Sequence, residues 1–510
     1  MCGIAGMWGE VNPPVLQQMI DQIAHRGPDG EGIHIQSNTG MLGHRRLAIM
    51  DPAGGAQPIY NENQAAAIVA NGEIYNFPQL RPALARRHDF ATTSDSEAIL
   101  HLFEEQDASA AAKLRGMFAF AVADEERLFL ARDPIGIKPL YYGKRRNGRE
   151  GDHFYFASEL KALIDHVDEV AEFPAGTYYD SRRGFVPYYR VPDAPPRERP
   201  LDEVLREVRQ GLEDAVVSHL MSDVPVGAFL SGGLDSSLIA AIARRHVREL
   251  HTFAVGVEGS SDLLAARHVA DYIGSIHHEY AFTPEEALEL LPEIIYYLES
   301  FDQDLVRSAI PCYFCARLAA DYVKVILTGE GADELFAGYQ YYKSYADPAA
   351  LHQELHRSVS TLHNLNLQRV DRLTMCHGIE GRVPFLDTHF IQLGMSIPTE
   401  LKLKAGRSGQ RVEKWVLRQA CEDLLPPEIV WRGKEKFGEG SGTIAMLQTA
   451  LEPLLNDIDL AAYQAKVGEP LRTAEEAYYH KLLAEAYSRP DLILRNVGRN
   501  LPPLAPADKG

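Results

Sequence analysis

Short apolar runs characterise the first 190 residues of the chain. Residues 66–70, 117–123, 127–131 and 153–157 are rich in apolar side chains, and several of these runs are joined by turn-forming Asp, Glu, Asn or Gly. Brief apolar runs bounded by turn residues are typical of β-strands. The first half is therefore predicted to be rich in β-sheet, with few helices.

The pattern changes in the second half, where helices and strands are predicted to alternate. Apolar residues recur at helical spacing across 201–220, and the apolar run 224–230 then predicts a buried strand. The runs 252–257 and 323–327 predict two further strands, the second of them preceded by a helical pattern at 310–320. Such alternation implies a parallel, doubly wound sheet, in which ligands bind beyond the carboxyl ends of the strands.

A polar, proline-rich stretch separates the two halves. Its residues lack any apolar period and should be extended and exposed. We therefore predict a first domain at 2–190, a linker at 191–200 and a second domain at 201–500, which is mainly helical from about Tyr345 onward. The proline-rich tail 501–510 is predicted to be disordered.

Composition narrows the class of protein. The chain has 510 residues, of which 24% are charged and 45% hydrophobic, as in a globular protein of two or three domains. A net charge of −20 argues against a nucleic-acid or membrane partner, since these favour a basic surface. The five scattered cysteines do not form a secreted disulfide pattern, and the sequence has neither a signal peptide nor a membrane-spanning run. A cytoplasmic protein with reduced thiols is predicted.

The segment Ser231–Ser237 carries the first candidate chemistry. Its sequence, SGGLDSS, joins a predicted strand to a predicted helix. Adjacent glycines allow the backbone to approach a ligand, the serines add hydroxyl donors, and a helix N-terminus favours an anion such as phosphate. Asp235 would repel phosphate unless a cation such as Mg²⁺ lies between them. The alternative is a glycine-rich turn that only caps a helix, but its place after a buried strand favours a site for nucleotide and metal.

Cys2 carries a second candidate chemistry at the amino terminus. Removal of the initiator methionine would leave it with both a thiol nucleophile and a basic α-amine. Arg46 offers a planar fork for a carboxylate, and Asp95 can hold an ammonium group. The segment Asn71-Gly72-Glu73 offers an amide and a backbone N–H for an oxyanion, with a carboxylate beside them. A buried cysteine with unrelated surface ion pairs and helix caps is the alternative interpretation.

Longer motifs add a resemblance to a known family. In the first half, the motifs that resemble the terminal-cysteine glutamine amidotransferase domain are Cys2-Gly-Ile, His25-Arg-Gly-Pro-Asp29, His44-Arg-Arg-Leu-Ala-Ile49, Asn71-Gly-Glu-Ile-Tyr-Asn76, the segment 132–140 and Ala157-Ser-Glu-Leu-Lys161. In the second half, the motifs that resemble the ATP-pyrophosphatase domain of bacterial, B-type asparagine synthetases are Ser231–Ser237, Gly329–Tyr339, Gly381–Asp387 and Trp431–Phe437. The resemblance covers nearly the whole chain in the family's order.

The resemblance implies an α/β protein with two different domains. The first would be an Ntn-hydrolase-like αββα sandwich that hydrolyses glutamine. The second would be a doubly wound ATP-pyrophosphatase domain with added helices, which uses ATP and Mg²⁺ to adenylate a carboxylate, with aspartate as the best candidate. Ammonia would pass between the domains through the interior. A homodimer is also implied.

The resemblance also assigns roles to single residues. In the first domain Cys2 is the nucleophile, Asn71 and Gly72 stabilise the oxyanion, and Arg46, Glu73 and Asp95 hold the amino-acid end of glutamine. In the second domain the pyrophosphate site is formed by Ser231, Gly233 and Ser236, the metal site by Asp235 and Asp333, and the nucleotide pocket by Leu230, Val255, Thr328 and Gly329. Glu330 is the candidate base and Lys434 the candidate charge-balancing cation, although both also suit surface positions in a turn.

One segment departs from the family pattern. Well-known members carry a Thr-Thr pair before an Arg-Ala-Ser sequence, whereas this chain reads Asp302-Gln-Asp304-Leu305-Val-Arg307-Ser-Ala309. Arg307 remains as a candidate ligand of the acceptor carboxylate, but the threonine pair is lost. Two alternatives therefore stay open: an amidotransferase of the same architecture acting on another carboxylic acid, and a non-catalytic sensor of glutamine or nucleotide. The intact set of catalytic residues counts against the sensor.

Overall fold

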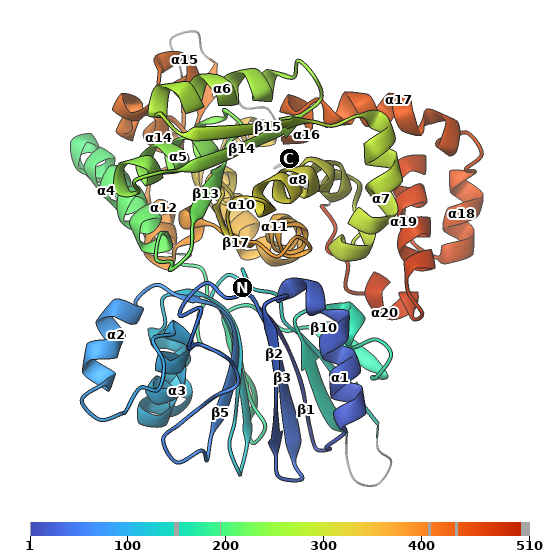
Figure 1. Cartoon of the computed structure of the whole chain (residues 1–510). Coiled ribbons are helices and arrows are strands. Elements are labelled where there is room, and N and C mark those ends of the chain that lie inside the picture. The colour runs from blue at the N-terminus through green and yellow to red at the C-terminus, as the bar shows by residue number, and fades with distance from the viewer. Residues whose placement is uncertain (1, 147–151, 194, 406–409, 434–436, 501–510) are drawn as a thin grey trace.

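The computed structural model describes residues 2–146, 152–193, 195–405, 410–433 and 437–500. The chain forms two halves that lie one above the other in Figure 1. Among the described residues, no helix has the length and apolar character needed to cross a bilayer. The predicted disorder of the tail 501–510 and the role of Lys434 lie outside the described residues.

The amino-terminal half is a sandwich of two six-stranded sheets. The first sheet has the order β10-β8-β9-β1-β3-β2 and consists of β1 (Gly3–Trp8), β2 (Gly30–Gln36), β3 (Gly40–Arg46), β8 (Tyr141–Arg145), β9 (His153–Ala157) and β10 (Glu169–Glu172). The second has the order β12-β11-β7-β6-β5-β4 and consists of β4 (Ile59–Tyr60), β5 (Ala67–Ile74), β6 (Gly116–Ala123), β7 (Leu128–Arg132), β11 (Thr177–Asp180) and β12 (Gly184–Pro187). All neighbouring strands in both sheets are antiparallel.

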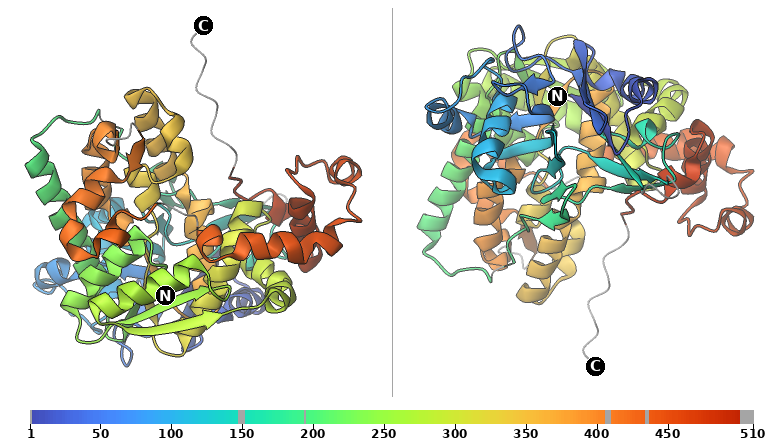
Figure 2. Two further views of the ribbon diagram at one scale, coloured as in Figure 1. Left: turned by 90° about the horizontal axis from the view of Figure 1, so that it is seen from above. Right: turned by 90° about the horizontal axis from the view of Figure 1, so that it is seen from below.

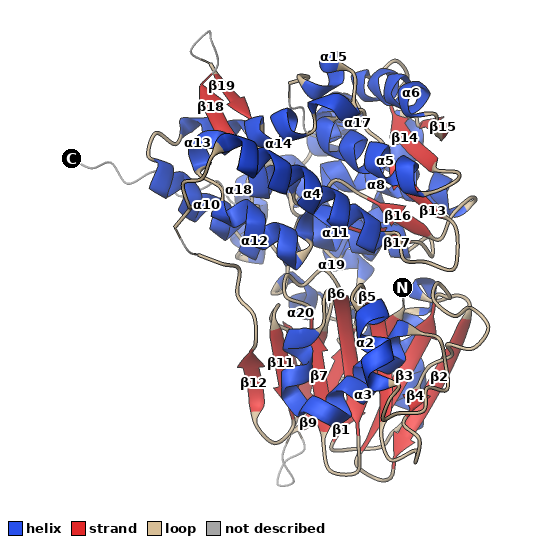
Figure 3. Cartoon of the chain, turned by 90° about the vertical axis from the view of Figure 1, so that its left-hand side faces the viewer, coloured by secondary structure: helices blue, strands red, loops and turns tan. Residues whose placement is uncertain are grey.

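Helices cover the outer faces of both sheets, which confirms the predicted αββα sandwich (Figures 1 and 3). Helix α1 (Pro13–Gln22) packs on β1 and β3, whereas α2 (Phe77–Leu84) and α3 (Asp95–Gln106) cover the side of β5. Between the sheets, Ile4 and Leu42 pack against Val69, Ala121 and Leu130. Alternating apolar positions along each strand therefore bury one face of each sheet in the common core.

The carboxyl-terminal half is built on a five-stranded parallel sheet. Its order is β15-β14-β13-β16-β17, with β13 (Val226–Phe229), β14 (His251–Gly256), β15 (Ile276–Ala281), β16 (Val325–Leu327) and β17 (Glu380–Arg382). The strands extend from β13 in both directions, which confirms the predicted doubly wound sheet. Along β14, Ala254 faces one hydrophobic cluster, and Phe253 and Val255 face the other. Both faces of the sheet are thus covered, as a parallel sheet requires.

Helices and two short strands complete this half. The helices next to the sheet are α4 (Leu201–His219), α5 (Leu234–His246), α6 (Ser261–Ile273), α7 (Pro284–Leu298), α8 (Gln303–Ala320), α9 (Ala332–Phe336) and α11 (Asn366–Met375). The others are α10 (Pro348–Ser360), α12 (Thr388–Ser396), α13 (Thr399–Lys402), α14 (Trp415–Ala420), α15 (Pro427–Val430), α16 (Phe437–Gly440), α17 (Thr443–Leu455), α18 (Leu460–Val467), α19 (Ala474–Ala486) and α20 (Pro490–Leu494). The strands β18 (Leu403–Ala405) and β19 (Arg411–Glu413) pair with each other. Figure 2 shows the last helices projecting to one side of the molecule.

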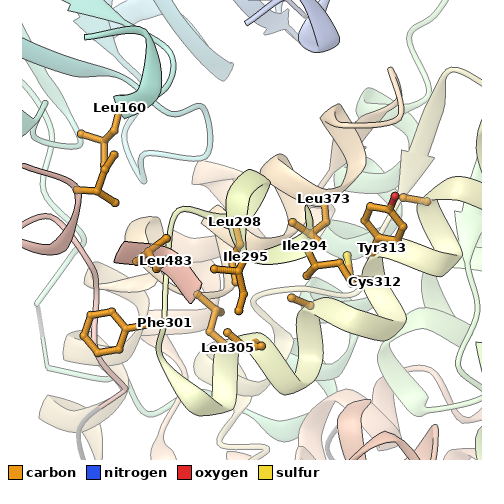
Figure 4. Packing of buried hydrophobic residues seen from close by; sticks show 14 of the residues in the cluster. Leu160, Ile294, Ile295, Leu298, Phe301, Leu305, Cys312, Tyr313, Leu373 and Leu483 are labelled. Atoms are coloured by element: carbon orange, nitrogen blue, oxygen red, sulfur yellow. The ribbon is translucent and has the colours of Figure 1, made fainter. Parts of the chain in front are cut away.

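The two halves share a buried interface. Figure 4 shows the largest apolar cluster, in which Leu160 of the first half belongs with Leu298 of α7 and Leu373 of α11. Charged side chains are also buried there: the Arg26 guanidinium lies 2.6 Å from Glu159 of its own half and 2.8 Å from Asp371 of α11. Buried ion pairs of this kind fix how two surfaces meet, because a displaced partner would leave an uncompensated charge.

Candidate active sites

Cys2 lies buried where β1 meets the second sheet. Its backbone N–H donates to the Asn71 side-chain oxygen at 3.0 Å, and its Sγ lies 3.9 Å from the Leu47 carbonyl oxygen. The Asn71 Nδ2 is buried and has no hydrogen-bond partner among the described residues. Burial raises the pKa of the Cys2 thiol. The sulfur therefore needs a base to become a thiolate, and an unused amide donor is available nearby.

Gly72 lies within strand β5, beyond the end of the strand predicted at residues 66–70. The prediction ended the strand at residue 70, but β5 continues to Ile74 because its pairing with β6 continues, with Gly72 opposite Phe118. Gly72 has a φ of 149°, and a Cβ there would lie 2.0 Å from the Met117 carbonyl oxygen. Only glycine fits this position, so the backbone beside Asn71 is held in one conformation.

Two carboxylates from separate elements lie near Cys2. Glu73 lies on β5, and Asp95 begins α3 and accepts a 2.6 Å hydrogen bond from the Ile74 N–H. Burial raises the pKa of Glu73 well above its usual range, and the carboxylates of Asp95 and Glu380 raise it further. Burial also raises the pKa of Asp95 to about 6. A site with such an excess of buried acidic groups suits a cationic ligand such as an α-ammonium group.

Arg46, at the end of β3, is predisposed to bind an anion. Its guanidinium donates to the carbonyl oxygens of Asp51 at 2.6 Å and Pro52 at 3.1 Å. These neutral acceptors orient the side chain without neutralising it. That Arg46 binds a carboxylate stays a prediction of the sequence.

The carboxyl-terminal half contributes Arg382, which the sequence analysis did not assign to this site. Its guanidinium is fully buried, lies 3.4 Å from a Glu73 carboxylate oxygen and pairs with Glu380 at 2.5 Å. It also donates to the carbonyl oxygens of His219 and Met221, both at 2.6 Å. The segment Gly381–Asp387 is one of the recognised motifs, and this contact with Glu73 places it at the junction of the two halves.

A second site lies in a pocket at the carboxyl ends of the parallel strands. All ten predicted nucleotide, pyrophosphate, base and metal residues that the structure describes line this pocket. They are Leu230, Ser231, Gly233, Asp235, Ser236, Val255, Thr328, Gly329, Glu330 and Asp333. The loops after β13 and β16 meet here because the strand order reverses between these two strands. Ligands of doubly wound sheets bind at such a switch point.

The glycine- and serine-rich loop is held in one shape by its own hydroxyl groups. The Ser231 N–H donates to the Ser236 hydroxyl at 3.2 Å, and the Gly233 N–H donates to the Ser231 hydroxyl at 3.3 Å. Gly232 has a φ of 69°, and a Cβ there would lie 2.4 Å from the Ala265 Cβ. Helix α5 starts at Leu234, so its free N–H groups point into the same pocket as the serines.

Lys414 is a pocket residue that sequence reasoning missed. Its Nζ lies 2.5 Å from an Asp235 oxygen and 2.5 Å from an Asp333 oxygen, and the side chain is almost fully buried. A Cβ on Gly338 would lie 2.2 Å from the Lys414 Cε, so this glycine leaves room for the lysine. The two aspartates are therefore brought together around one cation. The donor set fits Mg²⁺, which binds proteins through one or two carboxylates and takes its other ligands from phosphate and water.

The remaining predicted residues have other contacts. Glu330 is half-buried and forms an ion pair with Arg369 of α11. Arg307 is not among the residues that line the pocket, and its guanidinium forms a bidentate pair with Glu475 of α19 at 2.8 and 2.6 Å. Asp304 pairs with Arg472 at 3.1 Å. The altered segment is thus held by charges from the last helices.

Together the fold and the two sites define a class of protein: an amidotransferase with a cysteine-based site in one half and a nucleotide site in the other. Comparison with known proteins agrees. Residues 1–181 match the family model of the glutamine amidotransferase domain, and residues 207–350 and 344–501 match that of asparagine synthase.

Full-length relatives give the family. The chain is 39% identical over 518 residues to asparagine synthetase B [glutamine-hydrolyzing] of Escherichia coli, covering 96% of this chain and 92% of that protein. It is 38% identical over 519 residues to asparagine synthetase [glutamine-hydrolyzing] 2 of Arabidopsis thaliana, covering 96% and 87%. It is 37% identical over 556 residues to asparagine synthetase [glutamine-hydrolyzing] 1 of Saccharomyces cerevisiae, covering 98% of this chain and 96% of that protein. The chain therefore belongs to the glutamine-hydrolysing asparagine synthetase family.

Proposed function

We propose that this chain hydrolyses glutamine and uses the ammonia, with ATP, to convert aspartate to asparagine, with AMP and pyrophosphate as the other products. One observation supports this most: ten predicted residues of the synthetase half-reaction line one pocket, and in the other half of the chain the candidate nucleophile Cys2 is hydrogen-bonded to Asn71. The two sites suit different charges, the Cys2 site a zwitterionic amino acid and the pocket a polyphosphate.

In the glutaminase pocket, the Cys2 thiolate attacks the amide carbon of glutamine. Once the initiator methionine is removed, the α-amine of Cys2 takes the thiol proton and returns it to the leaving ammonia. The free amide donor of Asn71 and the backbone N–H of Gly72 stabilise the oxyanion. Water then hydrolyses the thioester, which releases glutamate and restores the thiol.

Three charged groups orient glutamine in this pocket. Arg46 binds the α-carboxylate, because its guanidinium has only carbonyl partners among the described residues. Glu73 and Asp95 bind the α-ammonium group, which also relieves the repulsion between these buried carboxylates.

In the nucleotide pocket, a carboxylate oxygen of the acceptor attacks the α-phosphorus of ATP and pyrophosphate leaves. The Ser231 and Ser236 hydroxyls and the N–H groups of this loop bind the pyrophosphate oxygens, while Leu230 and Val255 contact the nucleoside. Asp235 and Asp333 would hold Mg²⁺, which supplies charge neutralisation for the leaving pyrophosphate.

Ammonia then attacks the acyl carbon, and AMP leaves. Glu330 takes the surplus proton from the attacking ammonia. Lys414 supplies a fixed positive charge beside the phosphates, and Lys434 is proposed as a second one on the basis of the motif 431–437.

The ammonia route is proposed to cross the interface between the halves. Behind the glutaminase pocket, Met117 and Ile137 of the first half share a buried apolar cluster with Val383 and Leu327 of the second. An apolar, water-poor path would keep ammonia unprotonated, so that it remains a nucleophile.

An acceptor screen tests this function. Pyrophosphate release is measured with ATP, Mg²⁺ and glutamine across a panel of amino- and dicarboxylic acids. We expect the largest kcat/KM with aspartate, with one asparagine formed for each pyrophosphate. Release with other acids but not with aspartate would contradict the proposal.

One observation favours an alternative acceptor. The candidate carboxylate ligand Arg307 already has a carboxylate partner, Glu475, and Asp304 and Leu305 replace the threonine pair of well-known relatives. An amidotransferase of the same architecture that amidates another carboxylic acid would show this pattern. The same screen distinguishes the two candidates.

We also propose that the enzyme is a cytoplasmic homodimer. The five cysteines are free, as expected of thiols in a reducing compartment, and the dimer follows from the family resemblance alone. Sedimentation equilibrium of the purified chain should give twice the mass of 56.7 kDa, and a monomer would contradict this part of the proposal.

A further inference from the structure

A cluster of two histidines and two glutamates lies on the outer side of the amino-terminal half, away from the groups assigned above. It consists of Glu62 in the turn after β4, His88 in the loop after α2, and His101 and Glu104 on α3. One potential ligand atom of each residue lies within 4.8 Å of the other three. His101 is fully buried, so this is more than a chance gathering of surface charges.

The distances between the ligand atoms suit a small tetrahedral cation. His88 Nδ1 lies 3.2 Å from Glu62 Oε1 and 3.7 Å from Glu104 Oε2. His101 Nδ1 lies 3.0 Å from the same Glu104 oxygen. A tetrahedral zinc ion with bonds of about 2.0–2.1 Å separates its ligand atoms by roughly 3.3 Å. These three distances are close to this value before any ion binds, and all four ligand atoms lie within 4.8 Å of one another.

The far side of each imidazole ring faces a further carboxylate. Nε2 of His101 lies 3.5 Å from Glu97, and Nε2 of His88 lies 3.6 Å from Glu105. Histidines that ligate metals commonly present their second ring nitrogen to a carboxylate, which fixes the tautomer and orients the ring. Here both histidines are arranged so that Nδ1 faces the cluster and Nε2 faces a carboxylate.

The carboxylate ligands are oriented as well. The Asn61 side-chain amide donates to Glu104 Oε1 at 2.7 Å, which leaves Oε2 toward the histidines. The Asp89 N–H donates to Glu62 Oε1 at 3.0 Å. The two rings stack with centroids 4.4 Å apart, and the Nδ1 atoms of both histidines lie within 3.7 Å of the same Glu104 oxygen.

We propose that Glu62, His88, His101 and Glu104 form a binding site for one Zn²⁺-like transition-metal ion. Nitrogen and carboxylate donors in this combination suit zinc better than magnesium, which prefers oxygen ligands alone. The ion fastens the turn after β4 and the loop after α2 to helix α3. Because α3 begins with Asp95, the metal steadies the helix that presents this residue to the glutaminase pocket.

Cobalt substitution tests the site directly. Purified chain is stripped with a chelator, and Co²⁺ is titrated in the presence of excess Mg²⁺ while visible absorption is recorded. We expect one equivalent of Co²⁺ per chain, with the intense absorption of tetrahedral coordination and no thiolate charge-transfer band. In His88→Gln and Glu104→Gln the affinity should fall by at least about 100-fold. His268→Gln, which removes an exposed histidine of the other half, should bind as the wild type does.

Two measurements guard against misleading outcomes. Circular dichroism and the melting temperature without metal show whether His88→Gln is folded, and Glu62→Gln offers a second, exposed position if it is not. Cys2→Ala reports any ion bound at the nucleophile. Wild type that binds Co²⁺ no more tightly than folded His88→Gln would overturn the proposal, as would binding that is lost in Cys2→Ala and kept in His88→Gln. Either result would leave the cluster as histidines that only hydrogen-bond to glutamates.

Discussion

The two active sites balance their charges in opposite ways. In the glutaminase pocket, the buried carboxylates of Glu73 and Asp95 exceed the positive charge that the fold provides, and the pKa of each is raised by burial. In the nucleotide pocket, the carboxylates of Asp235 and Asp333 share the ammonium group of Lys414 at 2.5 Å each. The first site has more buried carboxylates than buried cations, whereas the second places one lysine between its two aspartates.

The difference follows from the substrates. Glutamine brings its own α-ammonium group, so the carboxylates that hold it are complete only when it is bound. ATP brings negative charge, so a pocket that holds both ATP and two aspartates needs cations of its own, from the protein and from metal. The unbalanced charge of a site thus indicates the charge of the ligand that it binds. A substitution that changes the charge of one site should therefore reduce the activity of that site alone.

Removal of the nucleophile should produce the largest difference between the glutamine-dependent and the ammonia-dependent activity. In Cys2→Ala we expect glutamine-dependent synthesis to fall by about 10⁴-fold or more, since a covalent step is lost. Synthesis from added ammonia should stay within about twofold of wild type because the nucleotide pocket is untouched. The two rates are compared by asparagine formation at saturating ATP.

A matched control is Cys376→Ala, which removes a thiol from α11's C-terminal end and should keep both activities. Equal loss of both activities in Cys2→Ala would show that the sites are not separable, and the comparison between them would fail.

Lys414→Met should remove the positive charge that the two aspartates of the nucleotide pocket share. Asp235 and Asp333 would then face each other and the phosphates without their shared ammonium. We expect synthesis from either nitrogen source to fall by roughly 10²- to 10³-fold, because a fixed charge that stabilises the reacting phosphates is lost. Glutamine hydrolysis alone, measured as glutamate release, should persist.

The control for this change is Lys404→Met, on β18, which removes a lysine over the Trp415 ring and leaves the pocket intact. Loss of glutamine hydrolysis in Lys414→Met, with synthesis retained, would reverse the assignment of the two pockets. A melting temperature close to that of wild type excludes unfolding as the cause.

Local pattern predicted seven of the strands, namely β5, β6, β7, β9, β13, β14 and β16, and left the others unassigned. The strand at 153–157 has the predicted bounds, and every residue of β9 is buried. Strand β17 was missed, since it is only Glu380-Gly381-Arg382 and carries buried charge instead of apolar side chains. Edge strand β15 was missed for a related reason: its side chains are half-exposed and polar.

The site residues also divide into those that the sequence could place and those that it could not. The loops after β13 and β16 could be placed together from topology alone, and the structure brings them into one pocket. Lys414 and Arg382 could not be placed, because a buried charge is stable only beside a partner that the fold brings from far away. Lys414 and Asp235 are 179 positions apart in the chain. Nothing in the neighbouring sequence of either residue signals the pair.

Acidification should weaken the glutaminase site through Asp95. Its pKa in the folded chain, about 6, lies above the usual value of 3.8, so the ionised form that holds an ammonium group is lost as the pH falls through about 6. We expect kcat/KM for glutamine hydrolysis to fall by up to about tenfold per pH unit below that point. In Asp95→Asn the value should already be reduced at pH 8 by about 10- to 100-fold, without this pH step.

The exposed Asp271 of α6 provides the control, since Asp271→Asn should keep the wild-type pH profile. An unchanged pH step in Asp95→Asn would assign the titration to another group, and the excess of negative charge would not explain substrate binding. Ammonia-dependent synthesis, measured in parallel, should show no such step.

The smallest expected effect concerns the charge pair at the altered acceptor segment. Glu475→Gln weakens the bidentate pair with Arg307, because it removes the negative charge while it keeps the size and shape of the side chain. If Arg307 binds the acceptor, as the sequence predicts, its guanidinium then has one less competitor, and the KM for the acceptor should fall by roughly fivefold, about 1 kcal/mol. Glutamine and ATP KM values should not change.

Glu485→Gln, at an exposed position of the same helix, is the control. An unchanged acceptor KM in both Glu475→Gln and Arg307→Gln, together with lower melting temperatures, would make the pair a structural link between α8 and α19. The acceptor would then be held by groups other than Arg307.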